Sequence, residues 1–364
     1  MFRSSSRFFL KPRLSVSIKA SSGGGRPRVS PGRIVRVTLS FAVLLLLAAS
    51  VALATGAGGI AFSPLAGVLR GFLPGSGITA DPTETSILLS IRLPRVLLAG
   101  IVGAALSSSG VIFQALLRNP LADPYILGIS GGAALGAVIG ISFGAAFASI
   151  GVPGLAFGGA LVTIFLIFSI SRTSSGHSGT TLLLTGVIIN AFFSALIMFF
   201  VSISTSGRLH SILFWLMGNL SLAQGYEIAS TATALLTGFL VMFLHARPLN
   251  LLALGDETAM QLGVDTKKTK VLLLVTASLV TATAVSASGT IGFIGLIIPH
   301  MLRFMLGPDH RLLLPASVLF GATFLIVTDT IARSIMAPFE LPVGVVTALC
   351  GAPYFLYLMR RRTF

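Results

Sequence analysis

Long apolar runs separated by short polar stretches recur along almost the whole chain. Most runs approach the ~20 residues that an α-helix needs to cross the hydrocarbon core of a bilayer. The pattern predicts an all-α membrane protein, a compact bundle of about ten transmembrane helices within residues 37–359. The expected helices cover residues 37–55, 94–117, 126–143, 153–170, 180–203, 226–245, 270–288, 290–306, 312–332 and 341–359.

The segment before the first apolar run has a different character. Residues 1–36 contain nine Lys or Arg and no acid, and they are rich in Ser, Gly and Pro. Such a composition predicts a basic, disordered tail. A transit peptide has a similar composition and is the alternative, whereas the first apolar run is too long for the core of a typical signal peptide.

Small residues crowd several expected helices, above all residues 100–110 and 128–140. In lipid no hydrophobic force drives helices together, so close backbone approach between small residues drives their packing. Prolines at or near the ends of the runs predict breaks, which membrane helices tolerate where the freed carbonyls face protein or a cavity. These features favour a tightly packed polytopic bundle over a single anchor.

Composition excludes a soluble protein. The chain is 54% hydrophobic and 10% charged, whereas soluble domains carry roughly a quarter charged residues. The net charge of +15 does not indicate a nucleic-acid binder, because the basic residues lie between apolar blocks and in the tails. The single cysteine, Cys350, excludes an internal disulfide.

The basic residues predict the orientation of the bundle. With the N-terminus inside, 20 of the 25 Lys and Arg lie on the cytoplasmic side, as the positive-inside rule requires. An even number of helices returns residues 360–364, which include three consecutive arginines, to the cytoplasm. Arg92, Arg95 and Arg333 are then among the few basic residues on the outside.

The sequence contains no motif for phosphate binding or catalysis that we consider specific. No G-x-x-x-x-G-K-[ST] stretch occurs, so ATP hydrolysis must belong to another polypeptide. The expected helices are almost free of mid-span carboxylates, which disfavours an ion-coupled secondary transporter. A G-x-S-G match at Gly128 to Gly131, with His300 as partner, leaves a rhomboid-like intramembrane protease as a remote alternative. We expect no catalytic residue, cofactor or bound metal.

Five stretches resemble the permease subunits of ATP-binding-cassette (ABC) importers for vitamin B12, ferric siderophores and haem, the FecCD-type or type II importers. They extend from about residue 90 to residue 359 in the family's order, and the tail before Ile34 has no counterpart. The stretches are Arg92-Leu93-Pro94-Arg95, Asn119-Pro120-Leu121-Ala122-Asp123-Pro124, residues 249–264, Gly292-Phe293-Ile294-Gly295-Leu296 with Pro299-His300 and Arg303, and residues 340–353.

The resemblance implies ten spans per subunit, a homodimer in the bacterial inner membrane, two cytoplasmic ATPase subunits and a periplasmic binding protein. The implied cargo is an iron chelate, either a ferric siderophore or haem, with cobalamin as the alternative. Nothing in the sequence distinguishes these cargoes.

The loop at 246–270 is the longest one expected in the cytoplasm, and it mixes apolar residues with acids. Apolar surface there requires a protein partner or the lipid interface, and both alternatives fit the residues. The resemblance favours a segment that docks on the ATPase. Its candidate residues are Leu254, Gly255, Asp256, Glu257, Leu262 and Gly263.

Two further sites are implied by the resemblance. Arg92, Arg95 and Arg333 would bind glutamates on the two lobes of the binding protein, although Arg333 is also placed to neutralise Asp329 one turn earlier. Asn119 and Leu121, with Gly179 and Thr180, would form the cytoplasmic gate. Plain helix capping by Asn119 and Thr180 is the alternative. His300 is expected to bond a carbonyl freed by Pro299, with haem ligation or proton relay as alternatives.

Overall fold

The computed structural model describes residues 30–56, 59–60, 82–172, 179–221, 224–337 and 339–360. The first part of the chain forms α1 (Pro31–Ala54), two-residue strands β1 (Thr55–Gly56) and β2 (Gly59–Ile60), α3 (Pro82–Ile87), a π-helical turn (Leu88–Arg92) and α4 (Leu93–Leu116). The middle part forms α5 (Ile129–Ser142), a 3₁₀ turn (Gly144–Phe147), α6 (Gly151–Arg172), α7 (Gly179–Ser202), α8 (Ser206–Leu216) and α9 (Gly225–Leu244). The last part forms α10 (Ala246–Leu252), α11 (Asp256–Gln261), α12 (Thr266–Ser288), α13 (Ile294–Leu306), α14 (His310–Ser334) and α15 (Val343–Arg360).

The described helices confirm the predicted all-α membrane fold. Seven of them are long and apolar enough to cross a membrane, and α5, α13 and α15 are shorter apolar helices. Together they occupy the ten predicted spans. Two features differ: α1 already begins at Pro31, and α8 forms a helix where a loop was expected. The chain also continues as helix through Pro299, Pro315 and Pro353.

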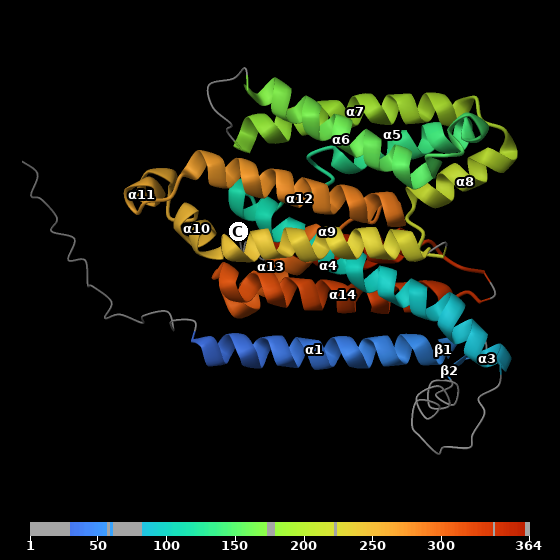
Figure 1. Cartoon of the computed structure of the whole chain (residues 1–364), viewed down its shortest axis with the longest axis horizontal. Helices are drawn as coiled ribbons and strands as arrows, with labels where there is room; N and C mark the ends of the chain where they lie inside the picture. Colours follow the sequence, from blue (N-terminus) through green and yellow to red (C-terminus); the bar gives the residue numbers. More distant parts are fainter. Residues whose placement is uncertain are drawn as a thin grey trace, which may run out of the picture.

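The long helices lie roughly along one direction, with α1 on one side of the bundle and α7 on the other (Figure 1). The short helices α10 and α11 project at one end, where α1 also begins. Helices α3 and α8 lie at the opposite end. Helix α15 also begins there, since the amide of its second residue, Gly344, donates to the carbonyl of Met217, directly after α8, at 3.1 Å. We refer to these as the α10–α11 end and the α8 end.

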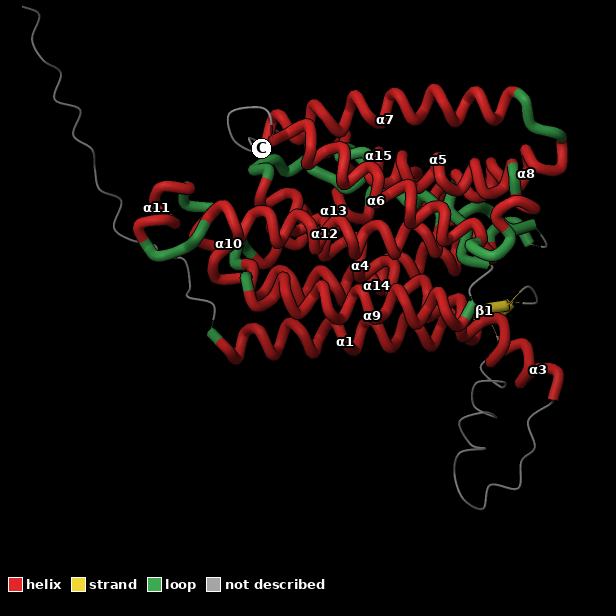
Figure 2. Tube along the Cα trace, turned by 45° about the horizontal axis from the view of Figure 1, so that its top comes forward, coloured by secondary structure: helices red, strands yellow, loops and turns green. Residues whose placement is uncertain are grey.

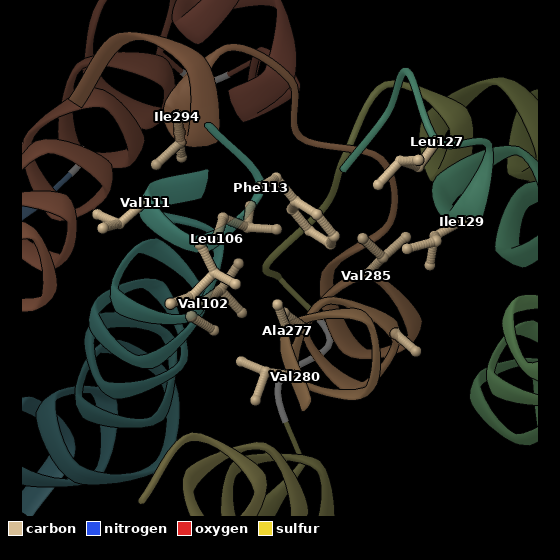
Figure 3. Close-up of a cluster of buried hydrophobic side chains, with 14 of the residues drawn as sticks. Val102, Leu106, Val111, Phe113, Leu127, Ile129, Ala277, Val280, Val285 and Ile294 are labelled. Atoms are coloured by element: carbon tan, nitrogen blue, oxygen red, sulfur yellow. The ribbon is translucent and has the colours of Figure 1, made fainter. Parts of the chain in front are cut away.

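Helix α4 forms the centre of the bundle. It packs against α9, α12, α13 and α14, and 18 of its 24 residues are buried. Leu106 and Phe113 of α4 gather with Val285 of α12 and Ile294 of α13 (Figure 3). The helices touch through their main chains: a Cβ on Gly110 would lie 2.0 Å from the Gly295 carbonyl oxygen. The predicted close packing through small residues is therefore present.

Helices α5 and α13 begin inside the bundle after irregular segments. The residue before each helix has a left-handed backbone, with φ of 79° at Gly128 and 72° at Phe293. Irregular backbone at this depth is tolerated only where protein or a water-filled cavity surrounds it. Within α13, the Gly295 carbonyl has no intrahelical donor because Pro299 lacks an N–H; Gln114 Nε2 donates to this carbonyl at 3.2 Å and to that of Leu296 at 3.0 Å.

Candidate coupling, gate and docking sites

Residues 246–263, which we call the coupling segment, form two short helices joined by a tight turn. Gly255 precedes α11 with a φ of 125°, and Gly263 follows it with a φ of 85°, conformations that L side chains rarely adopt. Asp256 and Glu257 occupy the first turn of α11, where negative charge stabilises a helix N-terminus. The inner face is anchored by the buried side chains of Leu249, Leu252 and Ala259.

The outer face of the coupling segment carries apolar side chains with no partner in the described part of the chain. Leu254, Met260 and Leu262 are 68%, 53% and 59% exposed. Met260 belongs to α11 and Leu262 follows its last residue; α11 projects beyond the long helices (Figure 2). An apolar surface of this kind suits a protein partner or the lipid interface.

Asp256 has two internal partners. Its Oδ1 lies 2.6 Å from Nη2 of Arg118, and its Oδ2 lies 2.5 Å from Nζ of Lys270. Asp256 therefore ties α11 to the end of α4 and to α12, while Glu257 remains exposed. Sequence reasoning missed Arg118 and Lys270, because they lie 138 and 14 positions from Asp256, beyond the i+3 and i+4 spacing of a single helix.

The expected gate residues 119–121, which we call the gate segment, follow α4 at the same end. Asn119 Oδ1 accepts a hydrogen bond from the Leu121 amide at 2.9 Å, and the Ala122 amide donates to the Asn119 carbonyl at 3.0 Å. These bonds show that Asn119 caps its own turn. Helix α7 begins at Gly179, but the side chain of Thr180 lies outside the described residues.

At the α8 end, Arg95 is buried in a charge network. Its side chain contacts both oxygens of Asp329 at 3.0–3.1 Å, the Glu340 Oε2 at 2.8 Å and the Ser221 hydroxyl at 3.4 Å. Only 8% of Arg95 is exposed. The expected partner of Asp329, Arg333, is more distant, with Nε 4.0 Å from Oδ2.

The other two expected docking arginines bind main-chain carbonyls at the end of α1. Arg92 donates to Leu53 O at 2.9 Å, and Arg333 donates to Thr55 O at 3.0 Å and to Ala52 O. Sequence places all three arginines correctly at one end of the bundle, yet each guanidinium already has partners within the chain. A binding partner at this end would have to share or displace them.

A polar cluster links the coupling segment to α14. Asn250 of α10 donates to Asp309 Oδ1 at 2.8 Å and accepts from the His310 amide at 2.9 Å. The hydrogen bonds from the Arg311 guanidinium lower the pKa of the Asp309 carboxyl to about 2. Asp309 is thus ionised at neutral pH and caps α14 as an anion.

A shallow groove of about 440 Å³ opens at the α8 end. Its lining is apolar or weakly polar, and no charged side chain contributes to it. The described residues contain no cluster of His, Cys, Asp or Glu that could hold a metal ion. The groove is lined by the end of α8, by the segment that precedes α13, and by α15. Its residues are Leu216, Met217, Thr290, Gly344, Val345, Ala348 and Leu349.

Comparison with known proteins agrees with this architecture. The chain is 46% identical over 281 residues to the cobalamin import system permease BtuC of Halobacterium salinarum, covering 77% of this chain and 75% of that protein. It is 45% identical to the hemin transport permease HmuU of Yersinia pestis, over 76% of this chain and 84% of the relative. A solved inward-facing metal-chelate type ABC transporter has a TM-score of 0.77 at 33% identity, covering 90% of this chain and 99% of that one. The sequence model of the FecCD transport family matches residues 34–361, and the chain therefore belongs to this family.

Proposed function

We propose that this chain is the membrane-spanning permease of an ABC importer that moves an iron chelate, a ferric siderophore or haem, into the cytoplasm. The observation that carries the proposal is the coupling segment. It projects from one end of a FecCD-family bundle and exposes Leu254, Met260 and Leu262. ATPase subunits supplied by other chains would bind there and drive transport.

The charge distribution supports placing the α10–α11 end in the cytoplasm of a bacterial inner membrane. Lys267, Lys268 and Lys270 lie at the start of α12, beside the coupling segment. Such an excess of basic residues marks the cytoplasmic side. The opposite end would then face the periplasmic binding protein.

The groove at the α8 end supports a path formed with a second copy of the chain. Its mostly apolar lining offers a bulky cargo few polar groups to bind, so the cargo could pass without binding tightly. A homodimer would close the open side of this groove and enclose a continuous path. The apolar faces of α8 and α15 beside it would supply the contact between copies.

Docking of a binding protein at Arg92, Arg95 and Arg333 is part of the proposal. Arg95 is held by Asp329 and Glu340, so it would act chiefly by ordering this end. Arg92 is half-buried and contacts a single carbonyl. It is the residue whose charge is most available to a carboxylate of the partner.

Cobalamin is the second candidate cargo, because the cobalamin permease shares 46% identity with the chain. The test is uptake into proteoliposomes holding the permease, its ATPase subunits and its binding protein, with labelled ferric dicitrate, haemin and cyanocobalamin as separate probes. We expect ATP-dependent uptake of an iron probe. Uptake of cyanocobalamin alone would show that the iron-chelate assignment is wrong. Uptake driven by a proton gradient without the ATPase subunits would show that the chain is not an ABC permease.

A further inference from the structure

We propose that Arg118 transmits movement of the ATPase-docking coupling segment to the cytoplasmic gate segment, an inference that rests on the proposed function. Arg118 is the residue directly before Asn119, where the gate segment begins. Its side chain, however, binds the coupling segment. One residue thus joins the site where force would enter to the site where the path would open.

The contact is made at the turn between α10 and α11. Nη2 of Arg118 donates to the carbonyl of Leu252, the last residue of α10, at 3.1 Å. The same nitrogen donates to Asp256 Oδ1, in the first residue of α11, at 2.6 Å. Two hydrogen bonds from one nitrogen thus attach the guanidinium to both sides of this turn. Displacement of the turn between α10 and α11 would therefore pull on Arg118.

The backbone of Arg118 lies at a natural hinge. On its N-terminal side, α4 is fixed in the core through the buried Phe113, Leu116 and Leu117. On its C-terminal side, the hydrogen bonds of Asn119 make the gate segment a compact turn. Arg118 itself has a φ of 48°, and among the described non-glycine residues only Phe293 shares a positive φ. Such a conformation persists where surrounding contacts hold it, so release of the guanidinium would free the turn to move.

The exposure of the ion pair argues against a merely stabilising role. The side chains of Arg118 and Asp256 are 52% and 40% exposed, and exposed ion pairs contribute little to stability because water and salt screen them. Lys270 binds the other oxygen of Asp256 from α12, and among the described residues no hydrogen bond or ion pair joins its side chain to the gate segment. The two basic partners of Asp256 therefore differ in what they connect.

The test compares variants that remove one partner of Asp256 each. Arg118→Asn removes the guanidinium and suits the backbone, since Asn adopts positive φ more readily than other L-residues. Lys270→Met is the matched variant, and Lys268→Gln, at a side chain that is 88% exposed, controls for loss of a surface charge. Arg118→Lys tests rescue by a retained charge, and Asp256→Asn approaches the same contact from the coupling segment.

Two measurements are made on the complete importer in proteoliposomes. The first is the number of ATP molecules hydrolysed per probe imported, with whichever of ferric dicitrate, haemin or cyanocobalamin the wild type transports. The second is the maleimide-labelling rate of Leu121→Cys in a Cys350→Ser background, without nucleotide and after trapping with ATP and vanadate. The labelling rate reports movement of the gate segment and does not depend on stability alone.

We expect Arg118→Asn and Asp256→Asn to raise the ATP-to-cargo ratio about tenfold, a size typical of free-energy coupling between sites, and to abolish the nucleotide dependence of labelling. Arg118→Lys should recover part of both, and Lys270→Met should change both less. An Arg118→Asn importer with wild-type ratio and labelling would overturn the inference, as would equal effects of Arg118→Asn and Lys270→Met. Failure of the proposed function is distinguishable, because the wild-type complex would then import none of the three probes with ATP.

Discussion

The guanidinium of Arg95 in α4 binds the carboxylate of Asp329 in α14 through Nε and Nη2, at 3.0–3.1 Å, across 234 positions of sequence. Both side chains are almost fully removed from solvent. Because the pair is doubly hydrogen-bonded and desolvated, it fixes the register between two central helices. Glu340 then attaches the segment before α15 to the same guanidinium.

Replacing Asp329 with Asn should destabilise the permease, because a buried guanidinium would lose its main counter-charge. We expect the free energy of unfolding to fall by about 3 kcal/mol, as when one partner of a buried pair is removed. The measurement is chemical unfolding of the purified protein in detergent. Glu340→Gln is the control, since the Glu340 side chain is 46% exposed and its loss should cost about 1 kcal/mol or less. Equal effects of the two variants would contradict the assignment.

The contact between α4 and α13 predicts a difference between two glycine-to-alanine variants. In Gly110→Ala the new methyl group would lie 2.0 Å from a main-chain oxygen, so the helices must separate. Overpacking of this kind costs about 1–3 kcal/mol. Gly158→Ala is the matched control, because a Cβ there meets nothing within 4 Å, and helix propensity should make it neutral or stabilising by up to about 1 kcal/mol. Thermal unfolding of both variants decides the point.

Exposed residues of the coupling segment should affect partner binding without affecting the fold. Leu254→Glu together with Leu262→Glu is expected to weaken co-purification of the ATPase subunits by about tenfold or more, as loss of interface anchors does. The melting temperature of the permease should stay unchanged, because both side chains are more than half exposed. Glu257→Lys tests the charge of this surface without touching the ion pairs of Asp256. Normal ATPase binding in both variants would place the docking surface elsewhere.

Arg92 offers the sharpest test of the opposite end. Reversal of Arg95 would place a carboxylate against Asp329 and disrupt the fold, so it cannot report on docking. Arg92→Glu should lower the affinity of the binding protein about tenfold, and the difference from wild type should shrink as salt screens exposed charges. Titration of the labelled binding protein at low and high salt measures both effects. An unchanged affinity would show that the main-chain bond of Arg92 is its whole role.

The spans were predictable because hydropathy is a property of single positions summed over a window. Each of the ten predicted spans contains a helix. Helix α8 was missed because its 11 residues are shorter than a span and include Arg208 and His210. The start of α1 was missed because Pro31 and Gly32 read as loop residues, although Pro is favoured in the first turn of a helix.

The candidate sites were predictable only as places along the chain. Resemblance located Asp256 and Arg95, but their pairing with Arg118 and Asp329 depends on how the chain packs. Arg333 was expected to pair with Asp329 because the two are four residues apart on one helix. The structure brings Arg95 closer from another helix, a relation that local spacing does not encode.

The main-chain contacts of α4 have a mechanical consequence. Gly103 and Gly110 bring α4 against the backbones of Gly321 in α14 and Gly295 in α13. Contacts between main-chain atoms leave no side-chain rotamers that can change to absorb a displacement, so these three helices should move as one rigid body. A displacement at the α10–α11 end would then reach the α8 end as a tilt of the three helices together. The flexible points would be the irregular segments that precede α5 and α13.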